Sequence, residues 1–132
     1  MTNPNTVVKR RNPVRSFRDL DVWQLGMELV VACYDMTNAL PKSELYGLTS
    51  QIRRAAVSVP ANIAEGQGRE HLGDYLRHLS IANGSLMKLE TEIIVTERIG
   101  YVTSKDTHPL LATSAKLGRM LAGPTRSLRR RT

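Results

Sequence analysis

The 132-residue sequence has few aromatic side chains and a single cysteine. Phe17 is the only phenylalanine, Trp23 is the only tryptophan, and aromatic residues make up 5% of the chain. A core made without them must come from Leu, Ile, Val, Ala and Met, which favours helices over a sheet. Cys33 alone can form neither an internal disulfide nor a multi-cysteine metal site, and its apolar sequence neighbours predict a buried thiol in a reducing, cytoplasmic setting.

Long apolar runs are also missing. No uninterrupted stretch approaches the roughly 20 residues that a membrane span needs, and no apolar segment of signal-peptide length follows the basic N-terminus. We therefore expect a soluble protein without a membrane partner. The length suits one domain with one hydrophobic core.

Acidic residues are absent from both ends of the chain. Residues 1–18 contain five basic side chains and residues 116–132 contain six, whereas between them twelve acidic side chains outnumber eight basic ones. Clustered Lys and Arg attract polyanions because each phosphate contact releases condensed counterions. Solvated segments that only aid solubility are the alternative. The candidate nucleic-acid-binding residues in these segments are Lys9, Arg10, Arg11, Arg15, Arg126, Arg129, Arg130 and Arg131.

The spacing of apolar residues predicts four helices. Their expected bounds are Asp19 or Asp21 to Pro41, Ser43 to Gly66 or Gly68, Leu72 to Ile99 with Gly100 as the stop, and a fourth helix after a turn at 103–106, with Pro124 as an end or a kink. A second apolar stripe on the first helix predicts that it buries two faces, one of them against another subunit or another part of the bundle. Its members are Trp23, Met27, Val30, Val31 and Tyr34.

Short connections between these helices predict an all-α, antiparallel up-down-up-down four-helix bundle. We expect the bundle to span residues 17–123, between a mobile basic arm at residues 1–16 and a basic tail at residues 124–132. No internal repeat or strand-like alternation competes with this interpretation.

Catalytic and metal-binding spacings are missing. The sequence has neither the Glu-x-x-His pairs of di-iron bundles, nor a zinc helix, nor an arginine followed five or six residues later by a histidine, as in some bundle-type ribonucleases. Asp74 and His78 are four apart, but two ligands do not complete a metal site, so an exposed helical pair is the preferred interpretation. We predict no enzyme, no cofactor and no metal. A nuclease that uses Asp74 and His78 is a minor alternative.

Residues 53–69, RRAAVSVPANIAEGQGR, combine helical spacing with a proline and many small side chains. Pro60 cannot donate a backbone hydrogen bond, so we expect a bend that costs about 3 kcal/mol unless neighbours compensate. The small side chains predict close contact with Ala82, Gly84 and Ser85 of the third helix.

The polar side chains of the same segment allow two interpretations. Asn62, Glu65 and Arg69 share one helical face, which predicts a structural polar network that fixes helix register or a subunit contact. A buried carboxylate in such a network would need a cationic partner. The functional interpretation is an anion or partner site that uses Arg53, Arg54 and Arg69.

Two long segments carry a family resemblance. "FRDLDVWQLGMELVVACYDMTNALPKSELYGLTSQIRRAAVSVPANIAEGQGR" and "YLRHLSIANGSLMKLETEIIVTERIGY" closely resemble the four-helix-bundle proteins encoded in intervening sequences of bacterial 23S rRNA genes. The resemblance covers about residues 17–123. The positions that carry it are Trp23, Tyr46-Gly47-Leu48, Gln51, Arg53, Arg54, Asn62 to Gly66, Arg69, Tyr75, Gly84-Ser85-Leu86 and Glu90-Thr91-Glu92. Met87 and Lys88 depart from the family, whose members commonly have Glu there.

The resemblance implies a ring-like homopentamer with a basic surface that engages nucleic acid. In the related accessory proteins of diversity-generating retroelements it also implies a reverse transcriptase as partner, and it implies no settled enzymatic activity. We therefore expect a non-enzymatic, homo-oligomeric bundle that binds RNA, or DNA, electrostatically through its basic arms and surface arginines. The alternative is a protein-interaction scaffold for a polymerase or another nucleoprotein.

Overall fold

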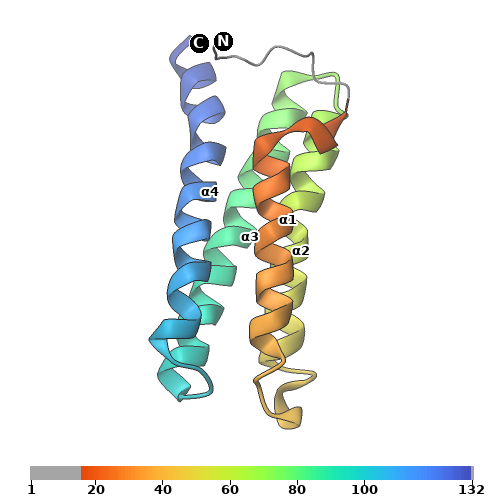
Figure 1. Cartoon of the computed structure of the whole chain (residues 1–132). Coiled ribbons are helices and arrows are strands. Elements are labelled where there is room, and N and C mark those ends of the chain that lie inside the picture. Colours follow the sequence, from red (N-terminus) through yellow and green to blue (C-terminus); the bar gives the residue numbers. More distant parts are fainter. Residues whose placement is uncertain (1–15, 132) are drawn as a thin grey trace, which may run out of the picture.

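The computed structural model describes residues 16–131, with side chains described as far as residue 123. Four helices pack as a bundle, and each runs opposite to the one before it (Figure 1). They are α1 (Asp21–Thr37), α2 (Leu48–Gln67), α3 (Leu72–Ile99) and α4 (Ser104–Arg131). Two short 3-10 turns, η1 (Phe17–Asp19) and η2 (Lys42–Glu44), precede α1 and α2. The predicted all-α four-helix bundle is confirmed.

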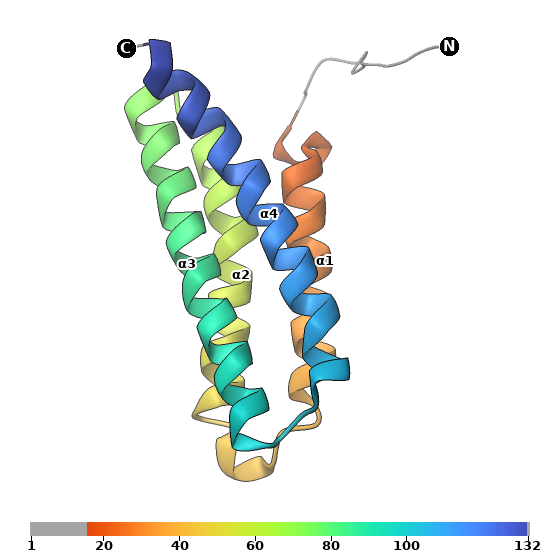
Figure 2. The same ribbon diagram turned by 90° about the vertical axis from the view of Figure 1, so that its left-hand side faces the viewer.

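The helices follow one another around the bundle, and α1 closes it against α4 (Figure 2). Apolar side chains from all four helices meet in one core, which includes Leu29, Ile52, Ile63, Leu86, Ile93 and Leu117. Each such side chain contributes roughly 1.5–3 kcal/mol through burial. Cys33 is fully buried in this core, and burial raises the pKa of its thiol to about 12. No described helix is long and apolar enough to cross a membrane.

The boundaries of α1 differ in part from the prediction. Ser16 and Asp19 form a capping box on η1 rather than on α1, and α1 itself begins at Asp21, one of the two predicted starts. The helix ends at Thr37 instead of continuing to Pro41. The Thr37 hydroxyl donates to the carbonyl oxygens of Cys33 and Tyr34 at 2.8 and 3.0 Å, which satisfies acceptors of the last turn.

The predicted start of the second helix at Ser43 is wrong, because α2 begins at Leu48. The acceptor for its first turn comes from Glu44, whose Oε1 accepts a hydrogen bond from the Leu48 N–H at 3.1 Å. Glu44 Oε2 accepts from the Tyr101 hydroxyl at 2.8 Å. The backbone hydrogen bond first, and the Tyr101 hydrogen bond second, hold the pKa of Glu44 below its ordinary value.

Pro60 lies in the middle of α2, which continues through it. It is buried against α1, where a Cβ added to Gly26 would stand 3.4 Å from Pro60 Cβ. This close packing of α1 on the proline ring offsets the hydrogen bond that Pro60 cannot make.

The predicted close contact between small residues of the second and third helices is only partly right. A Cβ on Gly66 would lie 2.9 Å from His78 Cβ, so this glycine allows α3 to approach α2. Ala82 is fully buried and Ser85 bonds to Ser58. Gly84, however, is exposed and faces open space, because it lies on the opposite side of α3.

The third helix has the predicted bounds, and Gly100 ends it in the left-handed conformation at φ 99°. α4 begins at Ser104, where Asp106 Oδ2 accepts hydrogen bonds from the N–H and the hydroxyl of Thr103, both at 3.0 Å. α4 then passes Pro124 and reaches Arg131, so the alternative of a helix end at Pro124 is wrong. The backbone of the predicted tail is therefore helical as far as Arg131.

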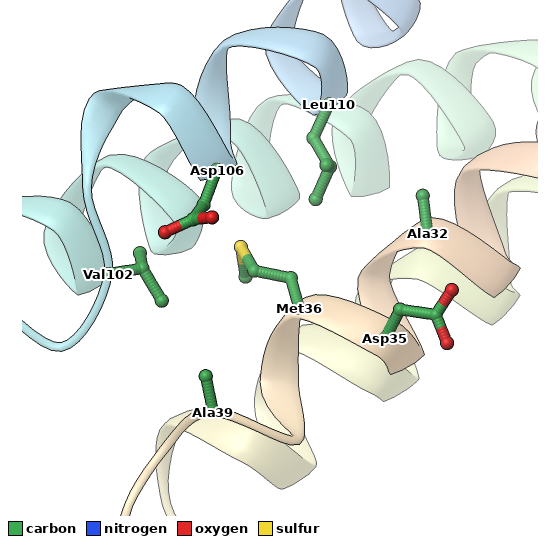
Figure 3. A pocket seen from close by; sticks show the side chains of 7 residues that line it. All are labelled: Ala32, Asp35, Met36, Ala39, Val102, Asp106 and Leu110. Carbon is green, nitrogen blue, oxygen red and sulfur yellow. The ribbon is translucent and has the colours of Figure 1, made fainter.

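An open hollow of about 380 Å³ lies where the end of α1 meets the start of α4. Met36 lies near its middle; the Asp35 carboxylate points away from Met36, whereas the Asp106 carboxylate extends toward the side of the hollow where Val102 and the Met36 sulfur lie (Figure 3). Ala32, Ala39, Val102 and Leu110 complete an apolar lining. Both aspartates are exposed, and the other lining residues are apolar.

Candidate nucleic-acid interface

The antiparallel topology places the start of α1 and the last turns of α4 at the same end of the bundle; in the sequence, the first basic segment precedes α1 and the second ends α4. The start of α1, the connection between α2 and α3, and the end of α4 all lie there (Figures 1 and 2). We call this the basic end. The connections from α1 to α2 and from α3 to α4 lie at the other end, which we call the opposite end.

The candidate residues from the two segments differ in what the structure describes. Lys9, Arg10, Arg11 and Arg15 lie outside the described residues. Arg126, Arg129, Arg130 and Arg131 belong to the last turns of α4, and their side chains lie outside the described part. Their positions on α4 place them at the basic end.

Arg53 lies near the opposite end, where it joins α2 to the last turn of α1. Its Nε donates to Thr37 Oγ1 at 2.9 Å, and its Nη2 donates to Asn38 Oδ1 at 3.2 Å. The guanidinium carbon is 4.5 Å from the centre of the Tyr34 ring, within cation–π range. Arg53 is thus bound within the subunit.

Arg54 is exposed on α2, and its charge acts on the buried Glu92 of α3. Glu92 is only 7% exposed, and its Oε1 has no hydrogen-bond partner among the described residues. Burial raises the pKa of Glu92 above its ordinary value, and the charges of Lys88 and Arg54 offset part of this effect. Arg54 therefore compensates a buried acid, although its exposure also leaves it open to a ligand.

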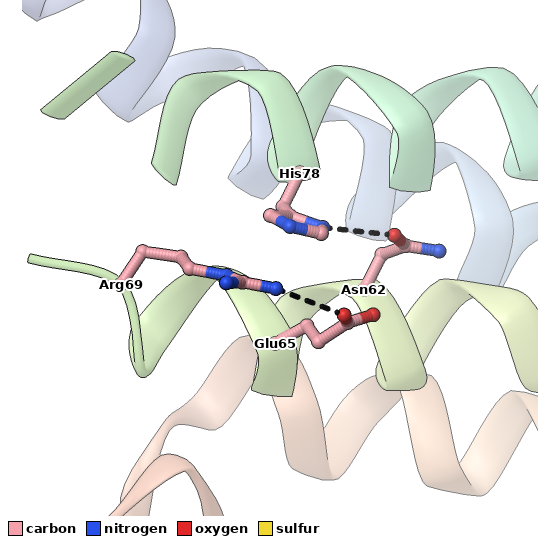
Figure 4. Close-up of polar contacts among 4 residues, drawn as sticks. All are labelled: Asn62, Glu65, Arg69 and His78. Carbon is pink, nitrogen blue, oxygen red and sulfur yellow. Dashed lines mark hydrogen bonds and ion pairs between the residues drawn. The ribbon is translucent and has the colours of Figure 1, made fainter. Parts of the chain in front are cut away.

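Glu65 in the last turn of α2 and Arg69, which follows the Gly68 cap of that helix, form an exposed ion pair at 3.2 Å (Figure 4). The expectation of a buried carboxylate at Glu65 does not hold. An exposed pair four residues apart contributes only about 0.3–0.5 kcal/mol. A phosphate could therefore replace Glu65 as the partner of Arg69 at little expense in stability.

Asn62 belongs to a separate polar network between α2 and α3. Its Nδ2 donates to the carbonyl oxygen of Ser58 at 2.9 Å, and the Ser58 hydroxyl lies 2.8 Å from that of Ser85. Because the amide nitrogen is used in this way, Oδ1 is the acceptor that faces His78 Nδ1 at 3.1 Å (Figure 4). The predicted group of Asn62, Glu65 and Arg69 is therefore split in two.

His78 was the member of this network that sequence reasoning missed. It is 5% exposed, so the expected exposed pair with Asp74 is wrong for His78, while Asp74 is exposed. A usable signal was present: His78, Ser85 and Glu92 are seven apart, which gives α3 a polar line along its contact with α2. Within residues 16–131 no group of three His, Cys, Asp or Glu side chains could hold a metal ion.

A family model described as "23S rRNA-intervening sequence protein" matches residues 18–123. The chain belongs to this family. The match includes all four helices up to the last turns of α4 and agrees with the resemblance predicted over residues 17–123.

A solved structure also resembles the bundle. It is a crystal structure of a protein from Bacteroides thetaiotaomicron, described as having unknown function and belonging to the S23 ribosomal protein family. The two share 22% sequence identity with a TM-score of 0.71, over 76% of this chain and 94% of that chain. Curated proteins give no match. This similarity supports the four-helix fold of the chain. It identifies no ligand.

Proposed function

We propose that this member of the family is a non-enzymatic protein that binds RNA electrostatically at the basic end of its bundle. DNA, which carries the same phosphate charge, is the alternative ligand. The observation that supports this proposal is the separation of basic from acidic side chains along the sequence. Residues 1–18 and 116–132 contain eleven of the nineteen basic side chains and no acid, and the helix ends that adjoin them, the start of α1 and the end of α4, lie at the same end of the bundle.

Phosphate contacts dominate such binding and make it dependent on salt. With about six to ten contacts, the affinity falls by roughly 10³–10⁵ between about 0.05 M and 0.2 M salt. We expect a titration of the purified protein with a single-stranded and a duplex RNA to follow this dependence, with equivalent DNAs as comparison. An affinity that is unchanged by salt would contradict the proposal.

Three variants with equal charge changes locate the interface. One replaces Lys9, Arg10 and Arg11 with Gln, another replaces Arg129, Arg130 and Arg131, and the control replaces the exposed Lys42, Arg98 and Lys105 near the opposite end. Each of the first two should reduce the slope of log affinity against log salt by about three, since each removes three phosphate contacts. If the control has the same effect, the basic end is not the interface.

Self-association is the second part of the proposal. An exposed hollow of about 660 Å³ at the α1–α2 edge contains Tyr34, Leu45, Tyr46 and Val57, and Tyr46 is 92% exposed. Polar side chains, among them Arg53 and Arg54, complete its lining. Large exposed apolar and aromatic side chains rimmed by polar ones favour a protein contact. We propose that it joins subunits into a homopentameric ring, in which repeated basic ends bind RNA by avidity.

Light scattering measures the mass directly, and Tyr46→Ser should reduce it if the hollow is the subunit contact. The same hollow also fits a scaffold that binds a polymerase such as a reverse transcriptase. A monomeric wild-type protein that binds this partner through Tyr46 would favour the scaffold over the pentamer.

A further inference from the structure

α1 contains three acidic residues and no basic residue. Asp21, Glu28 and Asp35 are seven positions apart, so they lie along nearly the same line of the helix. All three are exposed, and within the described residues none of them forms an ion pair. This arrangement contrasts with the basic segment that precedes α1 in the sequence.

Apolar surface lies beside this acidic line. Met27 is 38% exposed and Val31 is 60% exposed. They line a hollow of about 420 Å³, together with Gln24, Glu28, Ala32 and Asp35. Ala32 and Asp35 also line the hollow around Met36 (Figure 3), so the two hollows form one strip along α1. We call this strip the acidic face of α1.

We propose that the acidic face of α1 is the docking surface for the chain's own residues 7–15, VVKRRNPVR. The chemistry of the two is complementary along their length. Lys9, Arg10 and Arg11 match the carboxylates of the strip, and Val7 and Val8 match its apolar residues.

The reach of the segment agrees with this docking. Lys9 precedes Ser16, the first described residue, by seven positions, which corresponds to about 23 Å of extended chain. The line from Asp21 to Asp35 is fourteen residues of helix, or about 21 Å. The three basic residues can therefore fold back to Glu28 and toward Asp35 of the same chain. A short tether holds them near their partners at a millimolar effective concentration, which makes several weak pairs sufficient.

The docking has a consequence that rests on the proposed function. RNA phosphates and the α1 carboxylates compete for the same side chains of residues 9–11. A docked segment lowers the affinity for weak polyanions, and a ligand with many phosphates displaces it.

A cross-linking experiment tests the docking without RNA. Lys9 is the only lysine before Lys42, and a carbodiimide joins a lysine directly to a carboxylate that it contacts. We expect the full-length protein to give peptides that link Lys9 to Glu28 or Asp35, and to lose them at about 0.5 M salt, where exposed pairs are screened. Equal linkage of Lys9 to Glu70 and Asp74 would overturn the docking. In a mixture of unlabelled and isotope-labelled chains, peptides of mixed label would show that a neighbouring copy's segment is the occupant, which also overturns the proposal.

A matched pair of variants tests the competition. Glu28→Gln with Asp35→Asn is made in the wild-type chain and, as control, in the chain whose Lys9, Arg10 and Arg11 are replaced by Gln. In the wild-type chain the two changes should tighten RNA binding about threefold at low salt, the effect expected for two exposed ion pairs, and in the control chain they should not. An equal gain in both chains would overturn the competition. If the cross-links form but no variant binds RNA, the proposed function fails and the docking stands.

Discussion

The two ends of the bundle use their charged side chains differently. At the opposite end, Glu44 begins α2 and binds Tyr101, Asp106 begins α4, and Arg53 joins α2 to α1. At the basic end, Asp19 caps η1 with Ser16, and Arg69 forms an exposed ion pair with Glu65. The difference therefore lies in the arginines: Arg53 joins two helices at the opposite end, whereas Arg69 pairs with a residue four positions away.

The basic end is held together by close backbone contact instead. Gly66 lets α3 approach so closely that a Cβ added to this glycine would lie 2.9 Å from His78 Cβ. Nearby, Asn62 Oδ1 lies 3.1 Å from His78 Nδ1 across the same two helices. These contacts join α2 to α3 near the basic end without an arginine.

The largest expected effect comes from Gly66→Val. The added side chain must push α3 away from α2, and overpacking of this kind costs about 3 kcal/mol. Urea unfolding measures the loss. Gly84→Ala is the matched control, because Gly84 faces open space on α3 and alanine is the better helix former; it should stabilise by about 0.5–1 kcal/mol. Equal effects of the two substitutions would contradict the close contact at the basic end.

Arg53→Ala should lower the free energy of unfolding by about 1–2 kcal/mol, because it removes a stacked guanidinium and its hydrogen bonds to Thr37 and Asn38. Arg53→Lys should recover little of this, since an ammonium cannot reproduce the planar contacts. RNA affinity should change little in either variant. A loss of RNA affinity without a loss of stability would reassign Arg53 to the ligand site.

The sequence predicts the four helices because their apolar spacing is a property of each segment alone. Local geometry also reveals Gly100, which the left-handed helix end requires. The start of α2 could not be predicted in the same way, since its acceptor is Glu44 and that side chain is also held by Tyr101, 57 residues away.

The candidate site likewise has features that the sequence predicts and features that depend on contacts between helices. The arginines of the basic end follow from composition and topology. The separation of Asn62 from Glu65 depends on which of them faces His78 across α2 and α3, and spacing on one helix does not contain that information.

Glu92→Gln should stabilise the protein at neutral pH by about 1 kcal/mol, because it removes a buried charge with an unpaired oxygen. Glu92 has a raised pKa in the folded state. Its contribution to stability is therefore fully present below the unfolded pKa and is lost as the pH rises through the folded pKa. Unfolding measured across that range should show a fall that the Gln variant lacks. The same fall in both proteins would assign it to another group.

The smallest change in stability is expected for Arg69→Ala, below about 0.5 kcal/mol, because its pair with Glu65 is exposed. Its effect on RNA should nevertheless be measurable, since one lost phosphate contact reduces the salt slope by about one. Arg98→Ala is the control, an exposed arginine on the last turn of α3 near the opposite end. A slope that changes for Arg69 and not for Arg98 separates the two ends by function. Equal slopes would restrict the interface to the two basic segments.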